Sequence, residues 1–130
     1  MPRTPETPGS PKPTPAELDL LQTLWPLGAA TAKQVHEAML PQRPDVTHAT
    51  VLRLMQVMHG KGLLRRDESE RSHVYAPVHE RDTLQTSLLK DLMQRAFAGS
   101  ATSLVLAALK SGISKKERAE IEKLLREDKP

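Results

Sequence analysis

The stretch VTHATVLRLMQVMHGKGLLRRDESERSHVYAPV, from Val46 to Val78, changes its hydrophobic period halfway along. The apolar residues of its first half recur at helical spacing: Val51, Leu54, Met55 and Met58. Those of its second half recur at every second residue: Val74, Ala76 and Val78. The first period is typical of a helix and the second of a strand, so the stretch predicts a helix that runs into a β-hairpin. The other face of that helix is polar, and its role decides what the chain does.

Two further helices are predicted ahead of this stretch, and a capping box marks the start of each. Thr14 and Glu17 form the first box, and the helix that follows should end near residues 26–28. Thr31 and Gln34 form the second box, at the start of a helix of about three turns.

The third helix has Thr47 as its expected N-cap and should stop at the glycines of residues 60–62. Residues 63–67 and 72–77 are then predicted to be two strands on either side of a polar tip. Three short helices followed by a hairpin is the order of elements in a winged helix-turn-helix. We expect a single core in this region, centred on Trp25 and the leucines around it.

Apolar residues continue beyond residue 79 in three helical segments. Leucines line one face of the first, residues 104–109 are apolar nearly all round, and the third begins at a capping box of Ser114 and Glu117. One chain offers too few partners to bury this surface, and a second copy in a two-fold dimer is the economical solution. The residues predicted to hold the dimer are Leu84, Leu88, Leu92, Phe97, Leu106, Leu109 and Leu124.

The predicted fold class is therefore mainly α with a small β-hairpin. Residues 1–13 hold five of the eleven prolines and no large apolar side chain, so they are expected to form a disordered tail. Residues 14–78 are expected to be the winged-helix domain, and residues 79–130 the helical dimerisation domain. A chain of 130 residues has little room for anything further.

Composition argues against catalysis, metal binding and a cofactor. The sequence has no phosphate-binding glycine loop, no nucleophile elbow and no cluster of carboxylates that would suit a catalytic cleft. It has no cysteine and five histidines, and no two histidines have the i, i+4 spacing of a helical metal site. We predict that the protein is not an enzyme and has no metal and no cofactor.

The same features bear on the expected location. The longest strongly apolar run, residues 104–109, is far shorter than the roughly 20 residues that span a bilayer. The chain does not open on a signal-peptide pattern, and the lack of cysteine suits a reducing compartment. A cytoplasmic protein without a membrane partner is therefore expected.

Charge alone gives weak support for a nucleic-acid partner. The formal net charge is +3 and the pI is near 9.4, but residues 15–78 carry seven basic and seven acidic side chains. Most of these basic residues follow the start of the third helix: Arg53, Lys61, Arg65, Arg66 and Arg71. A local basic patch there is compatible with DNA binding.

The polar face of the third helix is the strongest candidate site, because its side chains can bond to base edges and phosphates in a major groove. Arg53 suits the O6 and N7 atoms of guanine, Gln56 suits adenine, and the methyl group of Thr50 can touch a thymine methyl. Arg71 in the hairpin could lie against the sugar-phosphate backbone. The predicted DNA-binding residues are Thr47, His48, Thr50, Arg53, Gln56 and Arg71.

Each of these features also has a simpler explanation. Polar residues on a helix face are usually just solvated. The hairpin could simply complete the sheet and shield the core, and charges on its strands discourage aggregation. The residues by themselves therefore leave DNA binding open.

Several strings follow one another in the order of these elements: TPAELDLLQTLWPLG, TAKQVHEAM, ATVLRLMQ, KGLLRR, HVYAPV and AGSATSLVLAAL. Together they resemble the penicillinase-repressor (BlaI/MecI) family of bacterial transcription factors over residues 14–128. The resemblance implies an N-terminal winged helix that binds palindromic operators and a C-terminal helical dimerisation region.

The match to this family is close at some positions of the third helix and fails at others. Thr50 matches the second threonine of the family's frequent Thr-Thr-Val. Ala49 stands in place of the first threonine, Arg53 in place of a small polar residue, and Val57 in place of a frequent arginine. The operator sequence should therefore not be borrowed from relatives.

The predicted function is that of a homodimeric transcriptional repressor, which occludes a promoter by placing two recognition helices in successive major grooves of a palindromic operator. The alternative is a winged-helix module that contacts another protein through the same face, and the near-neutral charge of residues 15–78 favours it. Salt-dependent binding to duplex DNA would separate the two. The expected partners are double-stranded operator DNA, a second copy of the chain, and an upstream sensor or protease.

Release from DNA is expected to differ from the switches that the resemblance suggests. Inducible penicillinase repressors are cleaved at an Asn-Phe bond in the dimerisation region, and the matching positions here are Ala107 and Ala108. Copper-responsive relatives use a cysteine cluster, whereas this chain has no cysteine. Cleavage elsewhere, a small ligand and a partner protein remain as candidate signals.

Overall fold

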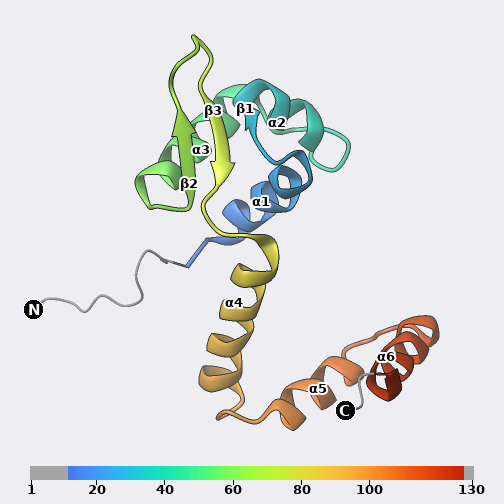
Figure 1. Ribbon diagram of the computed structural model, residues 1–130. Helices are drawn as coiled ribbons and strands as arrows, with labels where there is room; N and C mark the ends of the chain where they lie inside the picture. The colour runs from blue at the N-terminus through green and yellow to red at the C-terminus, as the bar shows by residue number, and fades with distance from the viewer. Residues whose placement is uncertain (1–11, 128–130) are drawn as a thin grey trace, which may run out of the picture. The chain divides into compact units, whose positions relative to one another are not determined.

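The computed structural model describes residues 12–127 (Figure 1). The expected tail of residues 1–13 therefore lies almost wholly outside the described residues. Contacts within the chain divide it into two compact units, with the division between Gln85 and Thr86. The elements in order are α1 (Pro15–Leu27), β1 (Ala30–Thr31), α2 (Ala32–Met39), α3 (His48–Gly60), β2 (Leu64–Asp67), β3 (Val74–Pro77), α4 (Arg81–Ala96), α5 (Ala101–Lys110) and α6 (Lys115–Glu127).

The first three helices begin at the caps that the sequence predicts. The N–H of Glu17 donates to Oγ1 of Thr14 over 3.2 Å, and the N–H of Thr14 donates back to Glu17 Oε1 over 2.9 Å. Thr31 and Gln34 repeat this exchange over 3.2 and 2.8 Å. Thr47 accepts a bond from a backbone N–H in the first turn of α3. These bonds satisfy donors that a helix start leaves without partners, and the predicted starts are confirmed.

The predicted hairpin of β2 and β3 is confirmed, but a third strand joins it. β2 pairs antiparallel with β3, and Arg66 lies opposite Tyr75. β1 pairs with the other edge of β3, where Ala30 lies opposite the same tyrosine, and the strand order is β1-β3-β2. β1 has only two residues, too few to show the alternation by which a strand is recognised.

The core of the first unit lies between α1, α2, α3 and the sheet. Its most deeply buried apolar side chains are Leu20, Leu21, Leu24, Val35, Val51, Met55, Met58, Leu64 and Tyr75. The expectation that Trp25 is the centre of this core is wrong, because its side chain is only half-buried. Its indole N–H donates to the backbone oxygen of His79 over 3.1 Å. An indole needs an acceptor for that N–H, and Trp25 finds one at the edge of the core, just before α4.

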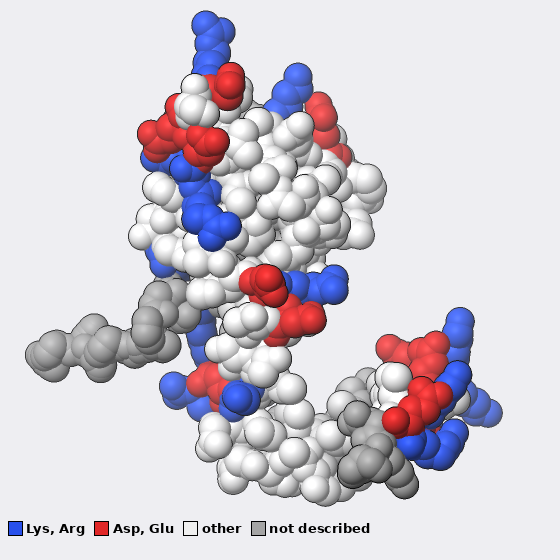
Figure 2. Space-filling view, in the orientation of Figure 1, with Lys and Arg blue, Asp and Glu red and all other residues white. Residues whose placement is uncertain are grey.

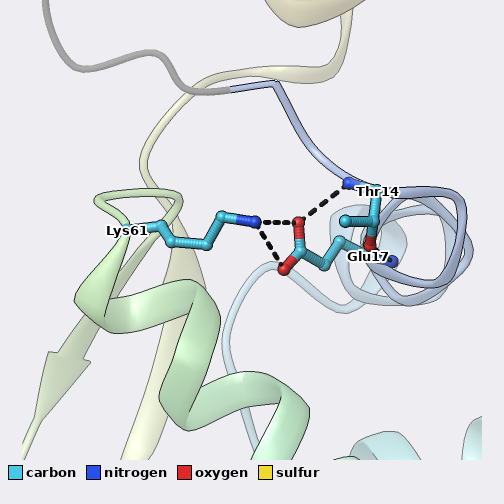
Figure 3. A network of polar contacts seen from close by, with 3 residues as sticks. All are labelled: Thr14, Glu17 and Lys61. Carbon is cyan, nitrogen blue, oxygen red and sulfur yellow. Dashed lines mark hydrogen bonds and ion pairs between the residues drawn. The ribbon is translucent and has the colours of Figure 1, made fainter.

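A partly buried ion pair, whose lysine is 31% exposed, joins the start of α1 to the end of α3 (Figure 3). The Glu17 side chain is 3% exposed, and Nζ of Lys61 lies 2.8 and 2.9 Å from its two carboxylate oxygens. Burial raises the pKa of Glu17, but the hydrogen bonds from Lys61 and Thr14 and the charge of Lys61 outweigh it and lower the pKa. Lys61 is the C-cap residue of α3, so the pair fixes the end of that helix against α1.

The second unit consists of the rest of α4 with α5 and α6, and none of its described residues is buried within the single chain. Its most exposed large apolar residues are Leu89, Leu92, Val105, Leu106, Leu124 and Leu125. Among residues 12–127 no single helix has the length and apolar composition to cross a bilayer. α4 and α5 have the necessary length and apolar composition only when they are taken together, and the chain bends by 96° between them.

Leu84 differs from the other residues that the sequence predicts to hold a dimer. Its side chain is only 6% exposed and belongs to the first unit. Leu84 is therefore buried within its own chain. The prediction that it needs a second chain to bury it is wrong. The first turn of α4 belongs with the winged helix, so the division of the chain falls later than the expected boundary between residues 78 and 79.

Candidate nucleic-acid interface

Helix α3 has one buried side and one accessible side. The buried side consists of Val51, Met55 and Met58. The accessible side contains all the helix positions predicted to touch DNA: Thr47, His48, Thr50, Arg53 and Gln56. Arg71 is also exposed, in the loop between β2 and β3. The structure thus brings the predicted residues to the surface, which contact with DNA requires.

Two of the threonines contact each other and differ in what they can offer a ligand. The hydroxyl of Thr47 accepts a bond from the N–H of Thr50 over 3.1 Å and donates to Thr50 Oγ1 over 3.0 Å. The first bond caps α3. The second uses the Thr47 hydroxyl proton. Thr50 retains its own hydroxyl proton and its methyl group for a base edge.

A hollow of about 300 Å³ lies between α3 and the wing, by which we mean residues 64–77. It is lined by Thr31, Ala32, Lys33, His48, Leu52, Gln56, Arg71, Ser72, His73 and Tyr75. His48, Gln56 and Arg71 were predicted from the sequence, and the hollow brings them together. None of the lining residues is acidic, and the N-terminus of α2 adds partial positive charge. The hollow therefore suits an anionic partner such as a DNA backbone.

Lys33 is a lining residue that the sequence did not single out. It is the second residue of α2 and lies within the capping box, between Thr31 and Gln34. A basic residue in the first turn of a helix is unfavourable for the helix itself, because the helix dipole already makes that end positive. That unfavourable placement was the signal available in the sequence.

Arg53 and Thr50 do not line the hollow and lie elsewhere on the accessible side of α3. Ala49 and Val57 stand four residues before and after Arg53, so they are its neighbours on the helix surface. Ala49 is exposed and Val57 is 47% exposed. Two positions at which the chain departs from the family's pattern therefore flank the arginine that was predicted to read guanine.

The wing carries charges of both signs, and Figure 2 shows basic and acidic side chains gathered there. Arg66 pairs with Glu68 over 2.6 Å and lies 6.0 Å from the centre of the Tyr75 ring. Among the described residues, Arg65 and Arg71 have no such ion pair. The Arg66 side chain is thus paired within the wing, whereas the Arg71 side chain is available to bind an anionic partner.

The sequence matches the family described as "Penicillinase repressor" over residues 13–127. The chain belongs to this penicillinase repressor family. It is a family of transcriptional regulators and not of enzymes, and its winged-helix N-terminus and helical C-terminus agree with the fold described above. The resemblance seen in the sequence is confirmed.

Two relatives, each named "Transcriptional regulator BlaI", come from the strains CDC 1551 / Oshkosh and ATCC 25618 / H37Rv of Mycobacterium tuberculosis. Both are 39% identical to this penicillinase repressor homologue over 66 residues, which is 51% of this chain and 47% of each relative. The chain thus spans about half the length of the curated relatives it matches.

Proposed function

We propose that this member of the penicillinase repressor family is a homodimeric, sequence-specific transcriptional repressor that occludes a promoter at a palindromic operator. The observation that carries the proposal is the accessible polar side of α3 beside a hollow without acidic residues, into which His48, Gln56 and Arg71 converge. The names of the two relatives support a role in transcription. Because its partner is DNA, we place the protein in the cytoplasm.

In the proposed complex α3 lies in the major groove, with its accessible side toward the base edges. Thr50, Arg53 and Gln56 read bases, since they can bond to base edges or touch a thymine methyl. His48, Lys33 and Arg71 lie around the hollow and approach phosphates. Phosphate contacts set the position of the protein, whereas base contacts set its preference for sequence.

The dimer is proposed from the unburied apolar surface of the second unit. The residues assigned to the contact are Leu88, Leu92, Phe97, Leu106, Leu109 and Leu124. Several of them are more than 45% exposed in one chain, a degree of exposure that large apolar residues rarely show in clusters on a monomer. A two-fold dimer would present two copies of α3 to two inverted half-sites.

The alternative is a winged-helix module that binds protein. It is favoured by the equal numbers of acidic and basic residues in residues 15–78 and by the internal pairing of Arg66 with Glu68. Binding to DNA would weaken steeply with salt because phosphate contacts release counterions, whereas docking to a protein would not release them.

Arg53 and Arg71 are expected to contribute in different ways. Arg53→Ala should cost about 1 to 3 kcal/mol on the preferred duplex and relax the preference at one base pair, because a base contact is lost. Arg71→Ala should weaken binding to preferred and random duplexes to a similar extent, because only a phosphate contact is lost. Fluorescence anisotropy on both duplexes measures the two effects. Equal losses on both duplexes for both variants would refute this division of roles.

The inducing signal is proposed to differ from cleavage at the family's Asn-Phe bond. Ala107 and Ala108 occupy the matching positions within α5, and both are exposed in the single chain. A protease selective for an Asn-Phe bond would find neither side chain there. An upstream sensor or protease that acts elsewhere, a small ligand or a partner protein are the candidates.

A further inference from the structure

His36 makes two contacts that bridge α2, the turn after it and the start of α3. Its Nε2 atom lies 2.9 Å from the backbone oxygen of Val46. Its ring centre lies 6.1 Å from that of His48, and the two ring planes meet at 76°. Val46 directly precedes the N-cap of α3, and His48 is the first residue of that helix. One side chain therefore touches both the turn and the start of the candidate recognition helix.

The bond to Val46 fixes the orientation of the His36 ring. A carbonyl oxygen can only accept, so Nε2 of His36 carries the proton in this bond. His36 is half-buried, whereas His48 is exposed. The ring held by Val46 thus forms one wall against which the exposed ring packs edge to face, which is a favoured geometry for ring pairs.

We propose that His36 is a positioning residue that holds the His48 imidazole in the orientation in which it donates to a DNA phosphate. This inference rests on the proposed function. An exposed side chain that is free to rotate loses that freedom on binding, which weakens the complex. Packing against His36 removes part of that freedom in the unbound protein.

The phosphate backbone is the target that the surroundings of His48 favour. Its ring lines the hollow together with the cations Lys33 and Arg71, and no lining residue is acidic. Arg53, one of the three residues assigned to bases, lies outside the hollow, whereas Gln56 lines it. A helix that enters a groove turns its flanks toward the two phosphate strands, and the hollow lies along one flank of α3. His48 is therefore assigned to the backbone and not to a base edge.

Four chains test this inference: wild type, His36→Gln, His48→Ala and the double variant. Glutamine keeps an N–H that can reach the Val46 oxygen but removes the ring, so it isolates the packing against His48. The probes are a duplex selected from a random pool by the wild-type protein and an unselected duplex of equal length. His36→Gln is expected to weaken binding about three- to tenfold when His48 is present and less than about twofold in the His48→Ala background. The loss should be similar on both duplexes.

His59→Gln is the matched control, because His59 is also a half-buried histidine of the first unit, whereas the ring that packs against His48 is that of His36. It should leave the affinity unchanged. A merely structural role for His36 predicts the same loss of affinity with and without His48, and that result would overturn the proposal.

An NMR measurement of the wild-type protein tests the packing without any variant. Cross-relaxation between ring protons of His36 and ring protons of His48 supports the packing, and its absence contradicts it. If wild type shows no salt-sensitive DNA binding, the proposed function fails. If wild type binds DNA but His36→Gln loses as much affinity without His48 as with it, only the role of His36 fails.

Discussion

A full-length chain with Leu92→Glu and Leu106→Glu is expected to be monomeric and to bind a duplex with two half-sites about a hundredfold more weakly than wild type. Both leucines are half-exposed in the single chain, at 48% and 50%, and neither contributes to the core of the first unit. A carboxylate buried in an apolar interface without a partner is strongly unfavourable. Once the dimer is lost, the second half-site is no longer bound within the same complex.

Sedimentation equilibrium measures the oligomeric state, and titration of the same duplex measures the affinity. Leu27→Glu is the matched control, because Leu27 is similarly exposed, at 45%, but belongs to the first unit. It should remain dimeric. A chain that ends at Gln85, and so keeps Leu84 in place, should behave like the double variant. A double variant that stays dimeric at micromolar concentration would show that the contact is elsewhere.

Lys61→Met is expected to lower the free energy of unfolding by about 1 to 3 kcal/mol at pH 7, because it leaves the buried Glu17 carboxylate without its charged partner. Urea denaturation measures the change. Asp19→Asn is the matched control, since the ion pair of Asp19 with Arg43 is exposed on both sides, and it should cost no more than about 0.5 kcal/mol. A loss for Lys61→Met as small as that of the control would contradict the role assigned to the pair of Lys61 with the buried Glu17.

The pH dependence of the same pair has a definite sign. The pKa of Glu17 in the folded protein lies below its ordinary value of 4.5. A depressed carboxyl pKa contributes stability above the unfolded value, and this contribution is lost as pH falls through the folded value. Without Lys61 the pKa of Glu17 is higher than in wild type, because the hydrogen bonds and charge of Lys61 no longer oppose the burial that raises it. The advantage of wild type over Lys61→Met should therefore be largest near neutral pH and shrink as pH falls through these two pKa values. A difference that is constant from pH 7 to the acid range would rule out this origin.

The helices of the winged helix could be predicted because their signals are local. A capping box spans four residues, and the period of α3 is visible within a single stretch. β1 could not be predicted, since its two residues become a strand only by pairing with β3. The positions of Trp25 and Leu84 depend on what lies beside them, and hydrophobicity alone does not tell the centre of a core from its edge.

The candidate site likewise has features that the sequence predicts and features that depend on contacts between distant residues. The accessible side of α3 follows from its period, so the exposure of Arg53 and Gln56 could be predicted. The contact of His36 with His48 depends on how α2 lies against α3, and no spacing in the sequence encodes that. The partner of Glu17 is equally hidden, because Lys61 is 44 positions away along the chain. Glu17 could be identified only as part of a capping box.

Selection of duplex DNA from a random pool by the wild-type protein tests the central claim most directly, when the affinity of the recovered duplex is then measured across a salt series. We predict that the recovered sequences share two inverted half-sites whose centres lie about 10 base pairs, or a multiple of that, apart. Affinity for this duplex should fall linearly with the logarithm of salt concentration. Recovered sequences without a shared inverted repeat, or binding that does not respond to salt, would contradict the account.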